Sequence, residues 1–418
     1  MDISPFKITV PDSQLEDLQL RLKLAKFPDE LDAANWDLGA PLADVQQLIA
    51  YWRDQFDWRK AEQALNQFPH FTTNIRCDNY ESLKIHFIHK KSDVEGAIPL
   101  LYVHGWPGSF LEGSKMIDNL TQGGTGNPAF DLVIISLPNY GFSEGSKKRG
   151  FAIEQYAETC HKLMQKLGYA QYVTQGGDWG VYITRAIAIK YPKHAVAHHI
   201  NFDQGEPPKL FSNPILKLEH TFKPYTKREK EGFARTSWFL SEGSGYRAEQ
   251  STKPQTLGYA FADSPVALFA WIYEKLHDWT DDYPWTEDEI CTWISIYWFS
   301  TAGPAASVRI YYEATHDWNK LGKNKITRER VAQWVGGGVK VGLSHFPRDL
   351  RVLPSTWTRT QGNVVFEKEH PSGGHFAAWE RPENLVSDLR EMFGKGGGAY
   401  GVVKGRSGYG NATIAAKL

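Results

Sequence analysis

The first sixty residues carry two helical patterns of apolar positions. Ser13 and Glu16 have the spacing of a capping box, which predicts that a helix begins just before the apolar run around them. The inward positions of this helix, and of a second one that begins near Pro41, recur at helical spacing: Leu15, Leu18 and Leu22, then Val45, Leu48, Ile49, Trp52 and Phe56. Each helix should therefore bury one apolar face.

From about residue 71 the pattern changes to strands, which then alternate with helices. Residues 83–89 alternate like a strand with one face in water, so His86 and His89 are expected at the surface. The apolar run at 132–137 is typical of a strand buried on both faces of a parallel sheet. The other expected strands are 71–75, 99–103, 172–174 and 195–200, with a helix over 153–167. This order predicts an α/β fold with a mostly parallel sheet flanked by helices.

The strand pattern fades in the third quarter of the chain and then returns. Aromatic residues recur there at helical spacing, which predicts a helical insertion. Strands are expected again at 339–343 and 363–366, followed by a helix over 382–393. We therefore expect five segments: an amino-terminal region (1–95), two parts of an α/β core (96–205 and 336–394), a helical insertion (206–335) and an exposed, flexible Gly-rich tail (395–418).

The charge balance and the cysteines exclude several classes of protein. The chain has 418 residues, with 47 Lys and Arg against 48 Asp and Glu, and no basic stripe, which argues against a nucleic-acid partner. The three cysteines have no paired spacing, so neither a disulfide framework nor a zinc site is expected. High aromatic content, with 15 Trp, favours an apolar pocket only weakly, because aromatic residues also fill ordinary cores.

The two ends of the chain bear on its location. The first residues lack both a basic start and a long apolar run, so we expect no signal peptide, no membrane anchor and a soluble intracellular protein. The last three residues are Ala416, Lys417 and Leu418, one residue away from the Ser-Lys-Leu peroxisomal address. A cytoplasmic and a peroxisomal location both stay open. The oligomeric state is open as well, with a homodimer as one candidate.

A strand, a tight turn and a helix surround Asp178. The turn reads Gly176-Gly177-Asp178-Trp179-Gly180, which has the form of a nucleophile elbow with Asp in place of Ser. If Ser attacked a saturated carbon it would form an ether, which water does not readily cleave. A carboxylate forms an ester there, which water can cleave. Asp178 therefore points to displacement at a saturated carbon, as in an epoxide or an alkyl halide.

Two late strands run into candidates for the remaining catalytic groups. The first leads to Asp349, and the second leads to His375, which stands between two glycines and a helical segment. A carboxylate nucleophile needs a base that activates water, and the base needs an orienting acid. The chain order of nucleophile, acid and histidine is that of α/β-hydrolases.

Four stretches carry a resemblance to a known family. They are His104-Gly105-Trp106-Pro107-Gly108-Ser109, the elbow at 176–180, Phe346-Pro347-Arg348-Asp349, and Gly373-Gly374-His375-Phe376-Ala377-Ala378. With these stretches the chain resembles epoxide hydrolases of the α/β-hydrolase fold, of the group similar to microsomal epoxide hydrolases and their soluble fungal relatives. The resemblance extends to about residue 393. It implies an α/β-hydrolase core, a helical cap over 206–335, and an amino-terminal region that wraps around core and cap.

The resemblance also implies roles for individual residues. Asp178 would be the nucleophile, His375 the base and Asp349 its orienting acid. Opening an epoxide needs a proton donor, and Tyr with a pKa of about 10 is protonated at neutral pH. The family has two cap tyrosines in this role, which here would be Tyr246 and Tyr311, with the adjacent Tyr312 as the alternative to the second.

Backbone groups and aromatic side chains complete the expected site. The N–H groups of Trp106 and Trp179 would form an oxyanion hole, an effect worth about 3 kcal/mol per donor. His104 would hold its turn rather than titrate. The substrate pocket would be lined by Trp106, Phe142, Trp179 and Trp238, which suits a small lipophilic or aryl epoxide.

The expected activity is hydrolysis of epoxides to vicinal diols without a cofactor or metal. Such an activity suits detoxification or the catabolism of aromatic hydrocarbons. A haloalkane-type dehalogenase shares the Asp elbow, but halide leaves without a proton and needs no tyrosines. A non-catalytic binder that has kept the fold is a further alternative, and a Ser-type esterase is disfavoured by Asp178.

Overall fold

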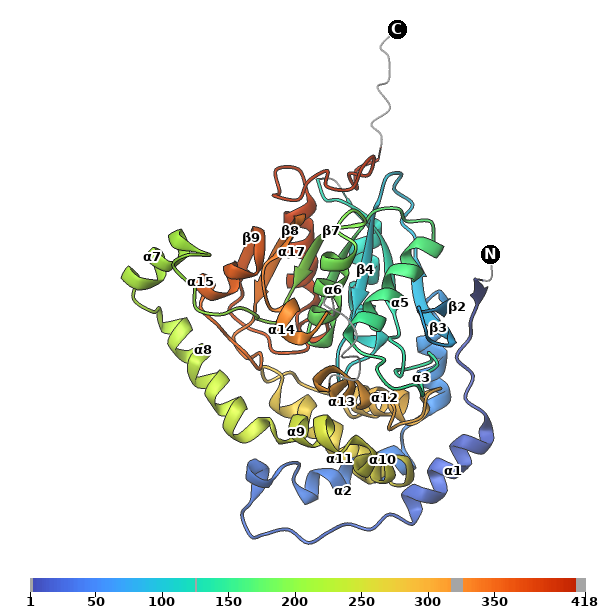
Figure 1. Cartoon of the computed structure of the whole chain (residues 1–418). Helices are drawn as coiled ribbons and strands as arrows, with labels where there is room; N and C mark the ends of the chain where they lie inside the picture. The colour runs from blue at the N-terminus through green and yellow to red at the C-terminus, as the bar shows by residue number, and fades with distance from the viewer. Residues whose placement is uncertain (1–2, 125, 317–325, 411–418) are drawn as a thin grey trace.

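The computed structural model describes residues 3–124, 126–316 and 326–410, and these are built around one mixed sheet (Figure 1). The order of strands across the sheet is β1-β2-β3-β5-β4-β6-β7-β8-β9. The strands are β1 (Ser4–Pro5), β2 (His70–Arg76), β3 (Ser82–Lys90), β4 (Ile98–Val103), β5 (Phe130–Ile135), β6 (Tyr172–Gly176), β7 (Ala195–Ile200), β8 (Val335–His345) and β9 (Gly362–Glu369).

Strands β4 to β9 are parallel, and β1 to β3 extend the sheet in antiparallel pairing. Every residue of β4 and β5 is buried, as expected for apolar strands covered on both faces. Because β3 pairs with β5, the amino-terminal region is continuous with the core sheet instead of forming a separate layer. The α/β-hydrolase fold expected from the sequence is confirmed.

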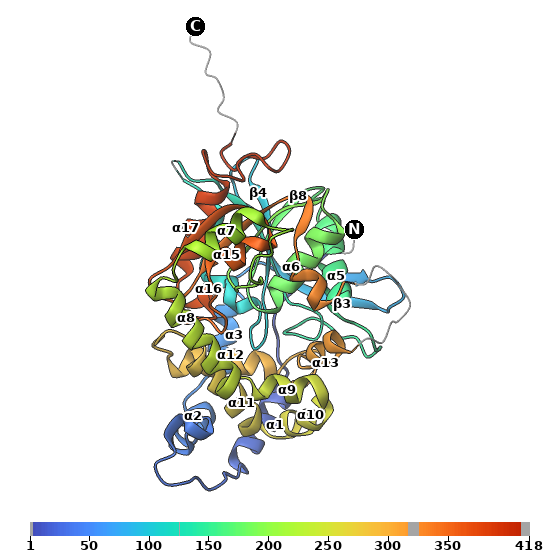
Figure 2. The ribbon, with the colours of Figure 1, turned by 60° about the vertical axis from the view of Figure 1, so that its left-hand side comes forward.

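Helices cover both faces of this sheet. Helices α5 and α6 contact each other on one face, and α4, α16 and α17 lie on the other (Figures 1 and 2). The bounds of these helices and of two further short ones, α14 and α15, are α4 (Ile117–Gln122), α5 (Ile153–Lys166), α6 (Trp179–Lys190), α14 (Arg328–Val331), α15 (Ser355–Thr358), α16 (Ala377–Glu380) and α17 (Pro382–Phe393). A 3-10 helix, Phe110–Met116, joins β4 to α4.

A helical cap lies over the carboxyl ends of the parallel strands, and the first helices pack against its outer side (Figure 1). The cap consists of α7 (Pro214–Phe222), α8 (Lys227–Trp238), α9 (Gly245–Thr252), α10 (Pro254–Asp263), α11 (Pro265–Asp278), α12 (Glu287–Trp298) and α13 (Arg309–Thr315). The outer helices are α1 (Asp12–Lys23), α2 (Leu42–Asp54) and α3 (Trp58–Leu65). Trp52 of α2 donates from Nε1 to Ser295 Oγ of α12 at 3.1 Å, so the amino-terminal region packs directly against the cap.

Two local expectations were wrong. Helix α1 begins at Asp12 after Pro11 and has no side-chain cap, so the Ser13–Glu16 spacing marks no capping box. His86 is fully buried, because β3 lies inside the sheet between β2 and β5. Its Nδ1 lies 2.7 Å from Ser136 Oγ and its Nε2 lies 2.9 Å from His70 Nδ1.

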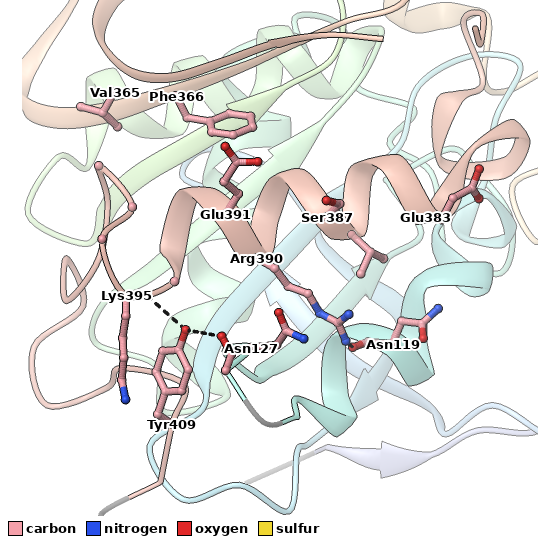
Figure 3. A pocket seen from close by; sticks show the side chains of 16 residues that line it. Asn119, Asn127, Val365, Phe366, Glu383, Ser387, Arg390, Glu391, Lys395 and Tyr409 are labelled. Atoms are coloured by element: carbon pink, nitrogen blue, oxygen red, sulfur yellow. Dashed lines mark hydrogen bonds between the residues drawn. The ribbon is translucent and has the colours of Figure 1, made fainter. Parts of the chain in front are cut away.

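The Gly-rich segment after α17 is not the exposed tail that its composition predicts. Ala399 and Val403 are buried, and Arg406 Nη1 lies 3.1 Å from Asp131 Oδ2 of β5. The hydroxyl of Tyr409 donates to Gly126 O at 3.1 Å and accepts from the Lys395 N–H at 3.1 Å (Figure 3). Residues 395–410 are therefore anchored to the core by a few buried residues and hydrogen bonds, while most of their side chains are exposed or half-buried.

The final tripeptide, Ala416 to Leu418, lies outside the described residues. Between α4, α17 and the packed tail is a cavity of about 790 Å³, shown in Figure 3. Its lining includes none of the predicted catalytic residues. Within the described ranges, no helix has both the length and the apolar character needed to cross a bilayer.

Candidate active site

The turn between β6 and α6 holds Asp178 in a backbone conformation that few residues adopt. Its φ is 46° and its ψ is −125°, a strained combination that is typical of functional turns. The chain can turn this sharply because two neighbours lack side chains. A Cβ on Gly176 would lie 2.8 Å from the Gly180 backbone, and one on Gly180 would lie 2.0 Å from Val103 O. The carboxylate is thereby presented at the carboxyl end of β6.

The loop after β4 contacts this carboxylate directly. The Trp106 N–H donates to Asp178 Oδ1 at 2.8 Å. A Cβ on Gly105 would lie 2.3 Å from the same oxygen, so only glycine allows this close approach. His104 Nδ1 lies 2.9 Å from Gly105 O, and its Nε2 accepts from the Leu137 N–H at 3.2 Å. Burial lowers the pKa of His104 to about 4, so this residue is neutral and shapes the loop.

His375 and Asp349 lie beside Asp178, on loops that follow β9 and β8. His375 Nδ1 lies 2.7 Å from Asp349 Oδ1, which also accepts from the Leu350 N–H at 2.7 Å. His375 Nε2 lies 3.3 Å from Asp178 Oδ2, without the alignment of a hydrogen bond. Asp178 and Asp349 are 171 positions apart in the sequence, and Asp349 and His375 are 26 positions apart. The fold brings the three side chains together, with the imidazole between the two carboxylates.

The charges of this group are coupled. Burial opposes the charged form of His375, but Asp349 and Asp178 outweigh it and raise its pKa to about 10. Burial also raises the pKa of Asp349, against the opposing effect of His375. At neutral pH the imidazole of the free site is therefore protonated, and its charge depends on the carboxylates that flank it.

Two cap tyrosines lie near the carboxylate. Tyr246 is on α9 and Tyr311 is on α13, and their ring centroids are 5.9 Å apart. The ring of Tyr246 stacks on Trp106 at 5.3 Å, and the ring of Tyr311 meets Trp179 edge-on at 4.9 Å. Burial and the charge of Asp178 raise the pKa of both phenols, so both are protonated at neutral pH.

Tyr311 and Tyr312 point in different directions. Among the described residues, the buried Tyr311 hydroxyl has no hydrogen-bond partner, and Tyr311 lines the same cavity as Asp178. Tyr312 stacks on His316 at 3.9 Å and lines a separate cavity beside α10. This geometry favours Tyr311 over Tyr312 as the second proton donor.

The cavity in front of Asp178 has a volume of about 360 Å³, and half of the residues that line it are aromatic. Trp179 lines it as predicted, whereas Trp106 reaches the site through its N–H and its stacking on Tyr246. The remaining lining includes Tyr182, Phe202, Phe233, Phe239, Leu240, Arg328, Leu350, Leu353 and Trp357. A cavity of this size and polarity fits a small lipophilic molecule.

Phe142 and Trp238 do not belong to this lining, contrary to the sequence-based expectation. Phe142 packs against Phe6 and Phe110 under the amino-terminal strand. Trp238 lies on the other side of α8, where Arg235 covers its ring at 4.4 Å. Neighbouring residues of a helix face different ways, so Phe239 reaches the cavity where Trp238 does not.

Most of the aromatic wall could not be found from the sequence. Phe202 follows β7, Phe233 lies on α8 and Trp357 lies on α15. Each of these segments shows only ordinary core-like spacing, and they meet only in the folded chain. Glu380, which contacts the loop of His375, was also missed because a single Glu after an apolar run carries no motif.

The fold and the site together define an α/β-hydrolase-fold enzyme with a carboxylate at the nucleophile position. Residues 98–207 match the family model of the alpha/beta hydrolase fold, and residues 3–113 match that of the epoxide hydrolase N terminus. The chain is 40% identical to a putative epoxide hydrolase of Stigmatella aurantiaca, over 94% of this chain and 84% of that protein. It is 35% identical to epoxide hydrolase 1 of Sus scrofa, over 94% and 88% of the two chains.

Two solved structures agree with these similarities. The epoxide hydrolase of Aspergillus niger has a TM-score of 0.79 at 33% identity, over 93% of this chain and 95% of that chain. The juvenile hormone epoxide hydrolase of Bombyx mori has a TM-score of 0.80 at 29% identity, over 93% of both chains. The chain belongs to the epoxide hydrolase family and is an epoxide hydrolase.

Proposed function

We propose that this enzyme converts small lipophilic epoxides to vicinal diols through a covalent ester on Asp178. The observation that carries the proposal is the position of Asp178 on a strained turn, between a backbone donor on one side and His375 on the other. Two buried phenols line the same cavity. The site thus supplies a nucleophile, proton donors and a base, which are the groups that the reaction needs.

In the first step, Asp178 Oδ2 attacks a ring carbon of the epoxide. Oδ1 is held by the Trp106 N–H, so we assign Oδ2 as the attacking oxygen and Oδ1 as the carbonyl oxygen of the ester. A new C–O bond forms, the ring C–O bond breaks, and the oxygen that leaves takes a proton from Tyr246 or Tyr311. The aromatic side chains of the cavity give the attacking carboxylate and the epoxide apolar surroundings.

The charge of Asp178 coordinates this step with proton donation. Burial chiefly raises the pKa of both tyrosines, and the negative carboxylate raises it further before attack. Attack converts the carboxylate to a neutral ester, which removes that influence, so the phenols become better acids as the alkoxide forms.

In the second step, His375 activates a water molecule. Esterification removes one of the two carboxylates that hold its pKa at about 10, so the imidazolium can give its proton, by way of water, to the tyrosinate that the first step leaves. The neutral imidazole can then act as a base. Water then adds to Asp178 Cγ, and the oxyanion on Oδ1 is stabilised by the N–H groups of Trp106 and Trp179. Trp179 is the first residue of α6, where backbone N–H groups lack helical partners. Collapse of this intermediate breaks the Cγ–Oδ2 bond, and the imidazolium of His375 protonates the diol oxygen as it leaves. The proton of the new carboxyl group then passes to the imidazole, which restores the Asp178 carboxylate and the protonated His375.

A single turnover in water enriched in ¹⁸O tests the ester directly. With enzyme in excess over epoxide, the diol from the first turnover should contain unlabelled oxygen from Asp178, and the protein should gain one ¹⁸O atom. Mass spectrometry of the diol and of the peptide around Asp178 measures both. Labelled diol with unlabelled protein would mean direct attack by water and would contradict the proposal.

A parallel assay distinguishes epoxide hydrolysis from the nearest alternative reaction, dehalogenation of an alkyl halide. A haloalkane-type dehalogenase would release halide from a bromoalkane and would need no phenols. We expect diol from styrene oxide and no halide, because buried Tyr246 and Tyr311 serve the leaving oxygen. Release of halide without diol would reassign the reaction.

A further inference from the structure

The loop that carries His375 is held by its backbone at four consecutive positions. The N–H groups of Gly373, Gly374, His375 and Phe376 each donate a hydrogen bond. Their acceptors are Asp281 Oδ2 at 2.8 Å, Glu380 Oε2 at 3.1 Å, Trp279 O at 2.7 Å and Glu380 Oε1 at 3.0 Å, in that order. The acceptors thus come from one buried carboxylate and from one cap segment, Trp279–Asp281.

Glu380 holds the residues on either side of the base. It ends α16, its side chain is buried, and its two oxygens accept from Gly374 and Phe376. Oε2 also accepts from the Asp281 N–H at 2.8 Å. Among the residues that the structure describes, these three backbone groups are its hydrogen-bond donors, and no cation pairs with it. A buried carboxylate without a cation is costly to keep, which suggests a functional reason for its presence.

Glu380 also connects the base to the cap. Asp281 follows α11, so one carboxylate joins the cap segment to the loop after β9. The Trp279 ring meets the imidazole edge-on at 5.1 Å, while its carbonyl accepts from the His375 N–H. The position of His375 relative to Asp178 is therefore set from the cap side as well as by Asp349.

We propose that Glu380 is a positioning residue, which holds His375 where it can activate water for hydrolysis of the Asp178 ester. This inference rests on the proposed two-step function, because only the second step uses His375 as a base. Displacement of a catalytic group by about 1 Å can cost about 100-fold in rate. Attack by Asp178 on the epoxide does not depend on the loop of His375 and should continue.

Burial raises the pKa of Glu380 to about 7, and the three N–H groups act in the opposite direction. The ionised carboxylate is the stronger acceptor for all three. The hydrogen bonds between Glu380 and the loop should therefore become stronger as pH rises through neutrality.

The variant Glu380→Gln tests the inference, with Glu383→Gln as its matched control. Gln keeps the size of the side chain but replaces one acceptor oxygen by an NH₂ group, which faces an N–H donor. Glu383 is exposed and three residues further along, so its variant makes the same charge change outside the site. Rapid-quench mass spectrometry of each protein after mixing with styrene oxide measures formation and decay of the ester separately.

We expect ester decay to slow by about 10- to 100-fold in Glu380→Gln, so that ester accumulates, with ester formation within about twofold of the parent. Glu383→Gln should match the parent in both steps. Equal slowing of both steps, or no change in either, would overturn the positioning role.

Glu380→Asp covers the case in which Glu380→Gln does not fold. It keeps a carboxylate but shortens the side chain by one methylene, which draws its oxygens away from the N–H groups of Gly374 and Phe376. The same selective slowing is expected, and normal decay would overturn the inference. His375→Gln separates this outcome from failure of the two-step function. If that variant forms no ester, the two-step function is wrong; if it traps ester while Glu380→Gln behaves as the parent, only the positioning role is wrong.

Discussion

At the scale of single residues, the charge on Asp178 controls the other ionisable groups of the site. It raises the pKa of His375 and, behind burial, that of Tyr246 and Tyr311. Neutralising this one charge therefore makes the phenols better acids and the imidazole a base. The two steps of the proposed reaction need those changes in that order, so the nucleophile itself switches the site between them.

The variant Asp178→Asn isolates this coupling without substrate. It removes one of the two carboxylates that raise the pKa of His375 to about 10, so that pKa should fall. Protonated His375 should then be lost at a lower pH than in the parent. NMR titration of labelled histidine side chains measures this, and the exposed His277 serves as an internal control. An unchanged or higher pKa of His375 would mean that Asp178 does not control the base.

At the same scale, the sequence predicted residues that stand in motifs and missed those that do not. Asp178 and His375 are marked by the glycines that their tight loops require, and the structure brings both together with Asp349. Glu380 and Phe233 have no such local mark. Phe142 and Trp238 were assigned to the pocket from their aromatic character alone, which does not fix the direction in which a side chain points.

At the scale of elements, a second buried group of charges joins β7, β8 and β9. His345 ends β8, and its two ring nitrogens lie 2.6 Å from Asp203 Oδ1 and 3.0 Å from Glu367 Oε1. Asp203 also accepts from the Leu353 N–H at 2.8 Å. Burial opposes the charge on His345, but the two carboxylates outweigh it and raise its pKa to about 10. This group anchors the loop that begins after β8 and carries Asp349.

Replacing His345 by Gln should destabilise the protein in a pH-dependent manner. Removing the cation leaves the buried carboxylate of Asp203 and the half-buried carboxylate of Glu367 without their shared partner, which we expect to cost about 3 kcal/mol. The pKa of His345 is higher in the folded state than the ordinary 6.5. Its contribution is therefore complete below about pH 6.5 and is lost as pH rises toward 10. The deficit of the variant in urea unfolding should be larger at pH 6 than at pH 9, and a deficit that is constant with pH would contradict the assignment.

Long, strongly patterned elements were the ones that the sequence predicted best. The expected helices at 382–393 and 153–167 agree with α17 and α5 within one residue at each end. The start of α1 was misplaced because Pro11 precedes the helix, which leaves Ser13 inside it. The exposure of His86 was wrong because period-two alternation does not reveal whether a strand lies at an edge or inside a sheet.

At the scale of the whole molecule, segments far apart in sequence complete one sheet and one site. The amino-terminal strands pair with β5, and α1 and α2 brace the cap that carries both tyrosines. The sequence predicted a core, a cap and an amino-terminal region, but not that β1 to β3 continue the core sheet. Strand order depends on pairing between distant segments, and no local pattern in 71–89 records its partner.

The packed tail offers a whole-molecule prediction, since its composition suggested disorder and its contacts indicate stability. Gly408 accepts from the Ala129 N–H at 2.8 Å and donates to Gly96 O at 2.9 Å, which joins the tail to the loops before β4 and β5. Truncation after Gly394 removes these bonds, the burial of Val403 and the contact of Arg406 with Asp131. We expect a loss of about 2–4 kcal/mol, visible as a fall in thermal midpoint.

Truncation after Gly410 is the matched control, because it keeps every one of these contacts. The cavity beside the tail shares no residue with the cavity of Asp178, so both truncated proteins should keep the parent kcat/KM at a temperature where they are folded. The shorter protein should differ from the control only in its thermal midpoint. Equal midpoints would mean that the tail adds nothing to stability, whereas a fall in kcat/KM would mean that the tail and the distant site are coupled through the sheet.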